Sequence, residues 1–161
     1  MNEMTVPLLH KTPKLSALAS IALLMIAIGG CGDREYMWDP LRIDADAPTE
    51  FSTTKSGLKY KVLRRGSGNF PLDGDKVWTH FKLSLTDGTV IDNSYRMGFA
   101  SEFEVGDKNH PVGFYEGMKL IAEGGMIELV ISPELGYGDT SMGAIPGGST
   151  IIYQIELINI R

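Results

Sequence analysis

Residues 77–93, VWTHFKLSLTDGTVIDN, carry the clearest structural pattern in the chain. Two sets of side chains alternate along 77–85, which predicts a strand with one buried face. The set expected to be buried comprises Val77, Thr79, Phe81, Leu83 and Leu85. Asp87-Gly88 then supplies the residue pair of a tight hairpin, because such a turn requires positive φ. Val90–Asn93 is therefore expected to return as a second, antiparallel strand.

Patterns on either side of this hairpin extend the expected sheet. Alternation or runs of β-branched residues predict further strands at 57–65, 101–105, 126–132 and 150–160. Phe114, Met118 and Ile121 are spaced as on one face of a helix, so a short helix is expected within 111–121. The glycines of 123–125 are expected to end that helix in the left-handed conformation. The sequence thus predicts an α+β domain in which one short helix covers an antiparallel sheet of about five strands.

Length and composition agree with this reading. The chain has 161 residues, enough for one ordinary domain and a tail. Hydrophobic residues make up 43% and charged residues 22%, which is typical of a globular protein. Its 19 glycines indicate many turns and short strands, so a helical bundle and a polytopic membrane protein are excluded.

Charge and cysteine content exclude several classes of function. Fifteen Lys and Arg against twenty Asp and Glu give a net charge of −5, which argues against nucleic acid as a partner. The single cysteine excludes an internal disulfide framework, a cysteine-rich zinc site and a C-x-x-C redox motif.

The N-terminal segment has the form of an export signal. Lys11 and Lys14 precede an uncharged, mostly apolar stretch at 15–30, as in a secretory signal peptide. The alternative is an uncleaved transmembrane anchor, since no charge occurs between Lys14 and Asp33 and the stretch just reaches the lower length limit for a membrane span. Gly29-Gly30 would make a poor end for such a helix. Under both interpretations the rest of the chain is expected to be exported.

The position of the only cysteine favours a lipoprotein. Ile28-Gly29-Gly30-Cys31 resembles the bacterial lipobox, in which the cysteine is acylated (palmitate is a typical acyl group) and becomes the new N-terminus; a chance match is the remaining alternative. We therefore expect a lipoprotein signal peptide at 1–30, a lipidated acidic linker at 31–50 and a folded domain at 51–161. The expected location is the bacterial cell envelope, where Cys31 would anchor the chain in a lipid bilayer, facing the periplasm if the bacterium is Gram-negative.

The residues that most catalytic sites need are missing. The histidines are His10, His80 and His110, and the first is lost with the signal peptide, so a transition-metal site is not expected. His80 lies on the outward face of its strand and is expected to be solvated. A G-x-S-x-G elbow is absent, and Gly136-Tyr137-Gly138 lacks the third glycine of a dinucleotide fingerprint. No metal and no cofactor are expected, so an enzyme here would have to act by shape and solvation.

From Gly57 to Arg161 the chain resembles the FKBP-type peptidyl-prolyl cis–trans isomerases. The segments that carry the resemblance, in order, are 87–88, 91–94, 103–106, 113–118, 131–138, 144–146 and 155–157. The resemblance implies an FKBP-like antiparallel sheet of five to six strands, half-wrapped around one short helix. It also implies isomerisation of X–Pro bonds during the folding of exported proteins.

Family positions transfer to individual residues of this chain. The resemblance assigns catalytic roles to Asp92, Tyr137, Phe103 and Ile145, and places Phe81, Ile91, Phe114 and Tyr153 in the substrate pocket. Phe114 should form the floor beneath the prolyl ring, and the Tyr137 hydroxyl and the Ile145 N–H should hold substrate carbonyls. Asp92 should be a buried carboxylate that polarises the site. The alternative for the inward aromatic residues is a purely structural place in the core, and for Asp92 a turn cap.

Several positions depart from the family's usual residues. The family usually has Tyr at Phe81, an aromatic residue at Ile91, Trp at Phe114 and Val-Ile at His110-Pro111, and Pro111 has no N–H to offer a substrate. The departures support a second hypothesis, a catalytically weak FKBP-fold binding or chaperone module on a lipid anchor. A third is a structural envelope lipoprotein without a ligand. The expected partners are proline-containing polypeptides and the bilayer, and the chain is expected to be monomeric.

Overall fold

A single antiparallel sheet organises the part of the chain that the computed structural model describes, residues 43–161. Residues 1–42, with the expected signal peptide, Cys31 and most of the linker, lie outside the described residues. The strands are β1 (Ser52–Thr53), β2 (Lys59–Arg64), β3 (Lys76–Leu85), β4 (Val90–Asn93), β5 (Ser101–Glu104), β6 (Met126–Ile131) and β7 (Ile151–Ile160). The helices are α1 (Ser94–Met97), α2 (Val112–Met118) and the 3₁₀ helix η2 (Pro133–Leu135).

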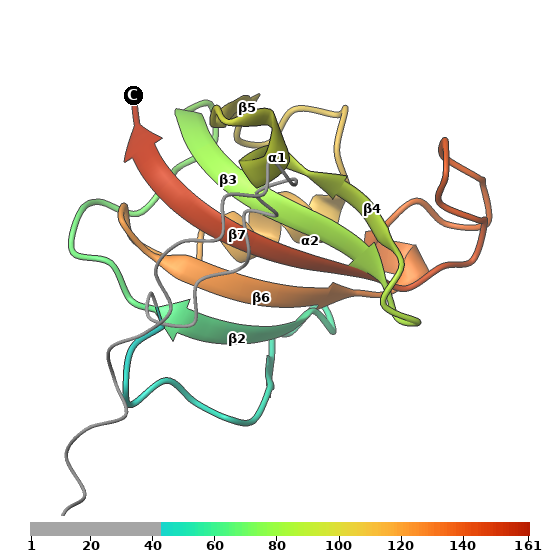
Figure 1. The fold of residues 1–161 in the computed structure, drawn as a ribbon, viewed down its shortest axis with the longest axis horizontal. Coiled ribbons are helices and arrows are strands. Elements are labelled where there is room, and N and C mark those ends of the chain that lie inside the picture. Colours follow the sequence, from blue (N-terminus) through green and yellow to red (C-terminus); the bar gives the residue numbers. More distant parts are fainter. Residues whose placement is uncertain (1–42) are drawn as a thin grey trace, which may run out of the picture. The chain divides into compact units, whose positions relative to one another are not determined.

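The strand order β1-β2-β6-β7-β3-β4, with β5 also paired to β3, is antiparallel at every pairing (Figure 1). The α+β architecture predicted from the sequence is confirmed. The sheet has seven strands because Ser52–Thr53 adds a two-residue strand to the edge of β2. A pair of residues is too short to show alternation, so β1 could not be predicted from the pattern.

The β3–β4 hairpin forms as predicted. Val77, Thr79, Phe81 and Leu83 are buried, whereas the residues between them are only half-buried. In the turn, Gly88 has φ +89° and the Leu85 N–H donates to the Thr89 carbonyl oxygen at 2.9 Å. The alternation therefore directs one face of β3 into the core along the whole strand.

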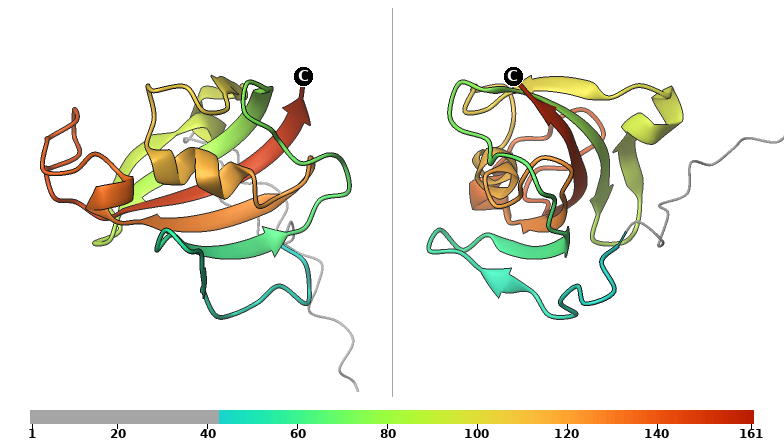
Figure 2. Two further views of the ribbon diagram at one scale, coloured as in Figure 1. Left: turned by 180° about the vertical axis from the view of Figure 1, so that it is seen from behind. Right: turned by 90° about the vertical axis from the view of Figure 1, so that its left-hand side faces the viewer.

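Helix α2 covers one face of the sheet, and the rear view in Figure 2 brings it in front of the strands. Its contact with β6 is close because Gly117 has no side chain: a Cβ there would lie 2.3 Å from Leu129 Cδ1. The helix ends at Met118, shorter than expected, and its C-cap residue Lys119 keeps right-handed helical geometry. Gly124 does adopt positive φ (+81°), but in the turn that leads into β6.

The opposite face of the sheet carries a buried polar cluster. Glu156 on β7 is 3% exposed, and its carboxylate accepts hydrogen bonds at 2.7 Å from Arg64 Nη2 and from the Tyr95 hydroxyl. His80 stacks on Tyr95 with ring centroids 4.6 Å apart, and its Nδ1 lies 3.2 Å from Ser94 Oγ. His80 was expected to be solvated; it is half-buried, because residues of α1 pack against this part of the outward face.

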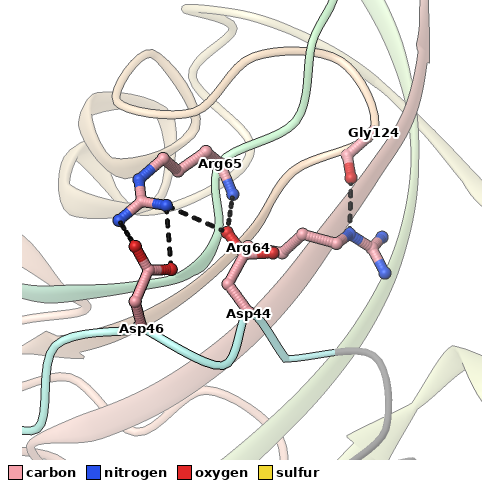
Figure 3. Close-up of polar contacts among 5 residues, drawn as sticks. All are labelled: Asp44, Asp46, Arg64, Arg65 and Gly124. Atoms are coloured by element: carbon pink, nitrogen blue, oxygen red, sulfur yellow. Dashed lines mark hydrogen bonds and ion pairs between the residues drawn. The ribbon is translucent and has the colours of Figure 1, made fainter.

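The end of the predicted linker that the structure describes contacts the domain. We call residues 43–50 the acidic strap; they form neither helix nor strand. The Asp44 N–H donates to the Leu63 carbonyl oxygen at 2.8 Å, and the Arg65 N–H donates to Asp44 Oδ2 at 3.1 Å. The Arg65 guanidinium binds both carboxylate oxygens of Asp46, at 3.0 and 3.1 Å, and lowers the pKa of that carboxyl group (Figure 3). The acidic strap thus lies against the end of β2.

Over the described residues, 43–161, no helix is both long enough and apolar enough to span a membrane.

Candidate active site

Four aromatic rings from four different elements meet between α2 and the sheet. They belong to Phe81 on β3, Phe103 on β5, Phe114 on α2 and Tyr153 on β7. Ring centroids are 5.8 Å apart for Phe81–Phe103 and 5.1 Å for Phe103–Phe114. They are 4.9 Å apart for Phe114–Tyr153 and 5.9 Å for Phe81–Tyr153. The structure therefore brings together four predicted pocket residues in one closed aromatic cluster, in the tilted and edge-on geometries that aromatic pairs favour.

The four rings differ in how much surface they expose. Phe114 is 0% exposed, Tyr153 4% and Phe81 6%, whereas Phe103 is only partly buried. Phe114 is enclosed by its neighbours, so it differs from the expected floor: no part of it is open to contact with a prolyl ring in this structure. Phe103 is the member of the aromatic cluster that a ligand can reach.

Tyr137 follows η2 and is half-buried beside the aromatic cluster. Burial raises the pKa of its hydroxyl, and a hydrogen bond with Tyr153 acts in the opposite direction. Burial is also the main cause that raises the pKa of Tyr153. Both hydroxyls therefore keep their protons at neutral pH, and Tyr137 can donate a hydrogen bond, as its predicted role requires.

Ile145 is buried in the 138–150 loop, with its side chain 4% exposed. Its N–H donates to the Met142 carbonyl oxygen at 2.9 Å, and the Met142 N–H returns a bond of 2.9 Å to the Ile145 carbonyl oxygen. The expected free donor at Ile145 is therefore already engaged, because these two residues close a tight turn of their own.

Two predicted residues, Ile91 and Asp92, lie on the edge strand β4. Ile91 is half-buried and packs against the core, as expected. Asp92 is exposed, and its Oδ1 accepts a 2.7 Å hydrogen bond from the Asn93 N–H. The prediction that Asp92 is buried is wrong, because β4 is an edge strand among the described residues 43–161 and leaves this side chain exposed. Its charge still reaches the site, where it contributes to the raised pKa of Tyr153.

His110, with Tyr115 and Asp107, forms a polar group at the site that was not predicted. His110 packs against Phe103 and Phe114, with ring centroids 4.8 and 5.6 Å away. Its Nδ1 lies 2.9 Å from the Tyr115 hydroxyl, which donates a very short hydrogen bond to Asp107. Asp107 and His110 lie in the loop before α2, and Tyr115 lies on α2 itself. The one feature of the sequence that marks this position is the His110-Pro111 pair, which departs from the family's usual residues.

The described part of the chain contains no group of three or more His, Cys, Asp or Glu side chains able to hold a metal ion. At the site, residues 43–161 supply tilted and edge-on aromatic rings, protonated tyrosines and one histidine. Such a site can bind an apolar ring and hydrogen-bond to carbonyl groups.

Comparison with known proteins identifies the family. The family model described as FKBP-type peptidyl-prolyl cis-trans isomerase matches residues 67–158. The FKBP-type isomerase FkpA of Buchnera aphidicola (subsp. Baizongia pistaciae) is 46% identical over 108 residues, which cover 67% of this chain and 42% of the relative. FkpA of Escherichia coli K12 is 41% identical over 109 residues, covering 68% and 40%. The chain therefore spans less than half the length of these two relatives.

Solved structures agree in fold. The crystal structure of FkpA from Escherichia coli matches with a TM-score of 0.67 and 38% identity, covering 71% of this chain and 53% of that one. AtFKBP13 matches with a TM-score of 0.64 and 31% identity, covering 70% of this chain and 99% of that one. The family match and these relatives show that the chain belongs to the FKBP-type peptidyl-prolyl cis–trans isomerases.

Proposed function

We propose that the protein catalyses cis–trans isomerisation of X–Pro bonds in exported polypeptides. The observation that carries the proposal is the aromatic cluster with Tyr137 beside it, on a chain of this family. Rotation about an X–Pro amide is slow because resonance must be lost, at a cost of roughly 18–20 kcal/mol. The planar amide is more polar than the twisted one, so an apolar surface that removes water from the amide favours the twisted state.

Each residue has a role in this proposal. The exposed edge of Phe103 receives the prolyl ring, and the Tyr137 hydroxyl donates to a substrate carbonyl. Tyr153, Phe81 and Ile91 form the apolar surroundings, and Phe114 holds the rings in place from below. Asp92 acts through its charge from the rim, and Ile145 can donate its N–H only if the turn with Met142 opens.

Replacing Tyr137 by phenylalanine tests the donor. Loss of one hydrogen bond is worth about 1 kcal/mol, so kcat/KM should fall roughly 2- to 10-fold. The measurement is exchange of X–Pro peptides followed by a protease-free assay on the purified chain. Tyr60→Phe on β2 is the matched control and should leave the rate unchanged. If the two variants behave alike, the Tyr137 hydroxyl has no part in catalysis.

A second candidate, a weakly catalytic binding or chaperone module, is favoured by three observations. The Ile145 N–H is engaged, Phe114 is fully buried and Asp92 is exposed. The same assay decides between the two functions. A folded chain that leaves peptide exchange at the uncatalysed rate rules out the isomerase, and titration with an X–Pro peptide then shows whether it binds.

The lipid anchor at Cys31 belongs to the same proposal. Its support is the lipobox-like stretch 28–31 behind an export signal. Two acyl chains would hold the protein stably at a membrane of the bacterial envelope, as a monomer that acts on proline-containing chains nearby. Expressed in a bacterium, the intact chain should become labelled with palmitate, and Cys31→Ser should abolish the label. Equal labelling of the two chains would contradict the anchor.

A further inference from the structure

His110 occupies the border between the aromatic cluster and solvent. Its ring meets Phe103 edge-on, with an interplanar angle of 87°, and lies tilted over Phe114 at 31°. The side chain is 29% exposed, so part of the imidazole can be reached from outside. Phe103 is the partly exposed member of the cluster and its ring packs against His110, so a substrate lying on Phe103 would meet His110 as well.

The hydrogen bonds around His110 fix which ring nitrogen carries the proton. Asp107 accepts bonds from the Asn109 N–H at 2.9 Å and from the Tyr115 hydroxyl, which lower its pKa to about 2, so it is ionised and can only accept. Burial and Asp107 raise the pKa of Tyr115, so the hydroxyl keeps its single proton. It uses this proton to donate the hydrogen bond to Asp107. The Tyr115 oxygen can then only accept from His110 Nδ1, 2.9 Å away. Nδ1 thus bears hydrogen in either protonation state, and Nε2 is the ring nitrogen left for contact with a substrate.

The site is poor in donors for substrate carbonyls. Pro111 has no N–H, and the Ile145 N–H donates to Met142. A protonated His110 would add both an N–H donor at Nε2 and a positive charge next to Phe103. A neutral His110 offers only a lone pair at Nε2.

The charged group that the structure places against His110 is a carboxylate. Asp107 Oδ1, in the loop before α2, lies 3.7 Å from Nδ1. From α2, Tyr115 faces it, and Glu104 on β5 and Tyr137 after η2 both act electrostatically on Tyr115. At alkaline pH these carboxylates repel an acidic peptide. Protonation of His110 would offset that repulsion.

We propose that His110 is a specificity-determining residue of the isomerase site, held through Nδ1 by Tyr115 and Asp107. As imidazolium it selects substrates with a carboxylate side chain beside the proline. Tyr115 and Asp107 act as positioning residues. The inference rests on the proposed isomerase function and adds to it a substrate class and a pH dependence.

The experiment compares two peptides that differ only in charge, Glu–Pro and Gln–Pro, with the protease-free assay on the purified chain. The peptide carboxylate stays ionised at about pH 5.5 and at about pH 8. The ratio of kcat/KM for Glu–Pro over Gln–Pro should be roughly three- to fivefold higher at the lower pH, the scale of one partly exposed ion pair. In His110→Gln, which keeps a polar side chain, the ratio should be the same at both pH values.

Tyr115→Phe keeps the ring of Tyr115 and removes its hydroxyl, which both accepts from His110 Nδ1 and donates to Asp107. Because His110 then loses the group that holds it, the pH dependence of the Glu–Pro over Gln–Pro ratio should shrink. A pH-dependent ratio that persists in His110→Gln would assign the effect to another group and overturn the inference. So would a pH-independent ratio in the unmodified chain. If the unmodified chain binds both peptides but does not isomerise them, the proposed function fails. In that case the ratio of the dissociation constants of the Gln–Pro and Glu–Pro peptides, measured at both pH values, tests the role of His110 independently of catalysis.

Discussion

Replacing Phe114 by alanine is expected to lower the free energy of unfolding by about 3–5 kcal/mol, the usual cost of truncating a fully buried phenylalanine. Phe114 is 0% exposed and touches the rings of Phe103, Tyr153, His110 and Tyr115. Alanine would leave a cavity at the centre of the aromatic cluster. Urea denaturation followed by circular dichroism should show the midpoint shifted by roughly 2 M.

Phe70→Ala is the matched control for this substitution. Phe70 lies in the loop between β2 and β3 and is 56% exposed, so its removal should change the unfolding free energy by less than about 0.5 kcal/mol. A Phe114→Ala chain as stable as Phe70→Ala would mean that α2 does not hold the cluster together.

Phe103→Ala should have the largest effect on catalysis, a fall of roughly 10- to 100-fold in kcat/KM. The estimate follows from the roughly 1.5–3 kcal/mol gained when a phenylalanine side chain is removed from water, here by contact with the prolyl ring. The assay is exchange of X–Pro peptides, with folding checked by circular dichroism.

Phe99→Ala serves as the control for Phe103→Ala, since Phe99 precedes β5 and is 62% exposed. Its rate should stay within about twofold of the unmodified chain. Equal losses in Phe99→Ala and Phe103→Ala would indicate a general effect of removing an aromatic side chain, and would contradict a prolyl site at Phe103.

The fold was predictable where local pattern and burial coincide. The alternation along β3 and the Asp87-Gly88 turn depend on neighbours only, and both are found as predicted. The end of α2 was not predictable in the same way. Ile121 is buried and fits the helical spacing, yet the chain leaves the helix after Met118 to reach the turn at Gly124.

The site, too, was predictable only in part. The aromatic residues were placed by family resemblance and strand alternation, and the structure brings them together. The exposure of the Asp92 side chain could not be predicted, because it depends on whether another element covers the edge of β4. The state of the Ile145 N–H depends on the closure of a turn, and the His110–Tyr115–Asp107 contacts depend on how a loop folds back on α2. Such contacts have no periodic signature in a sequence.

The docking of the acidic strap limits how far the domain can travel from a lipid. If Cys31 carries the anchor, Asp44, whose N–H donates to the Leu63 carbonyl oxygen, is 44 − 31 = 13 residues from the anchor along the chain. Fully extended, such a segment spans at most about 45 Å. An isomerase anchored in this way would stay close to the bilayer. Its substrates would be polypeptides that emerge from the membrane or lie on it.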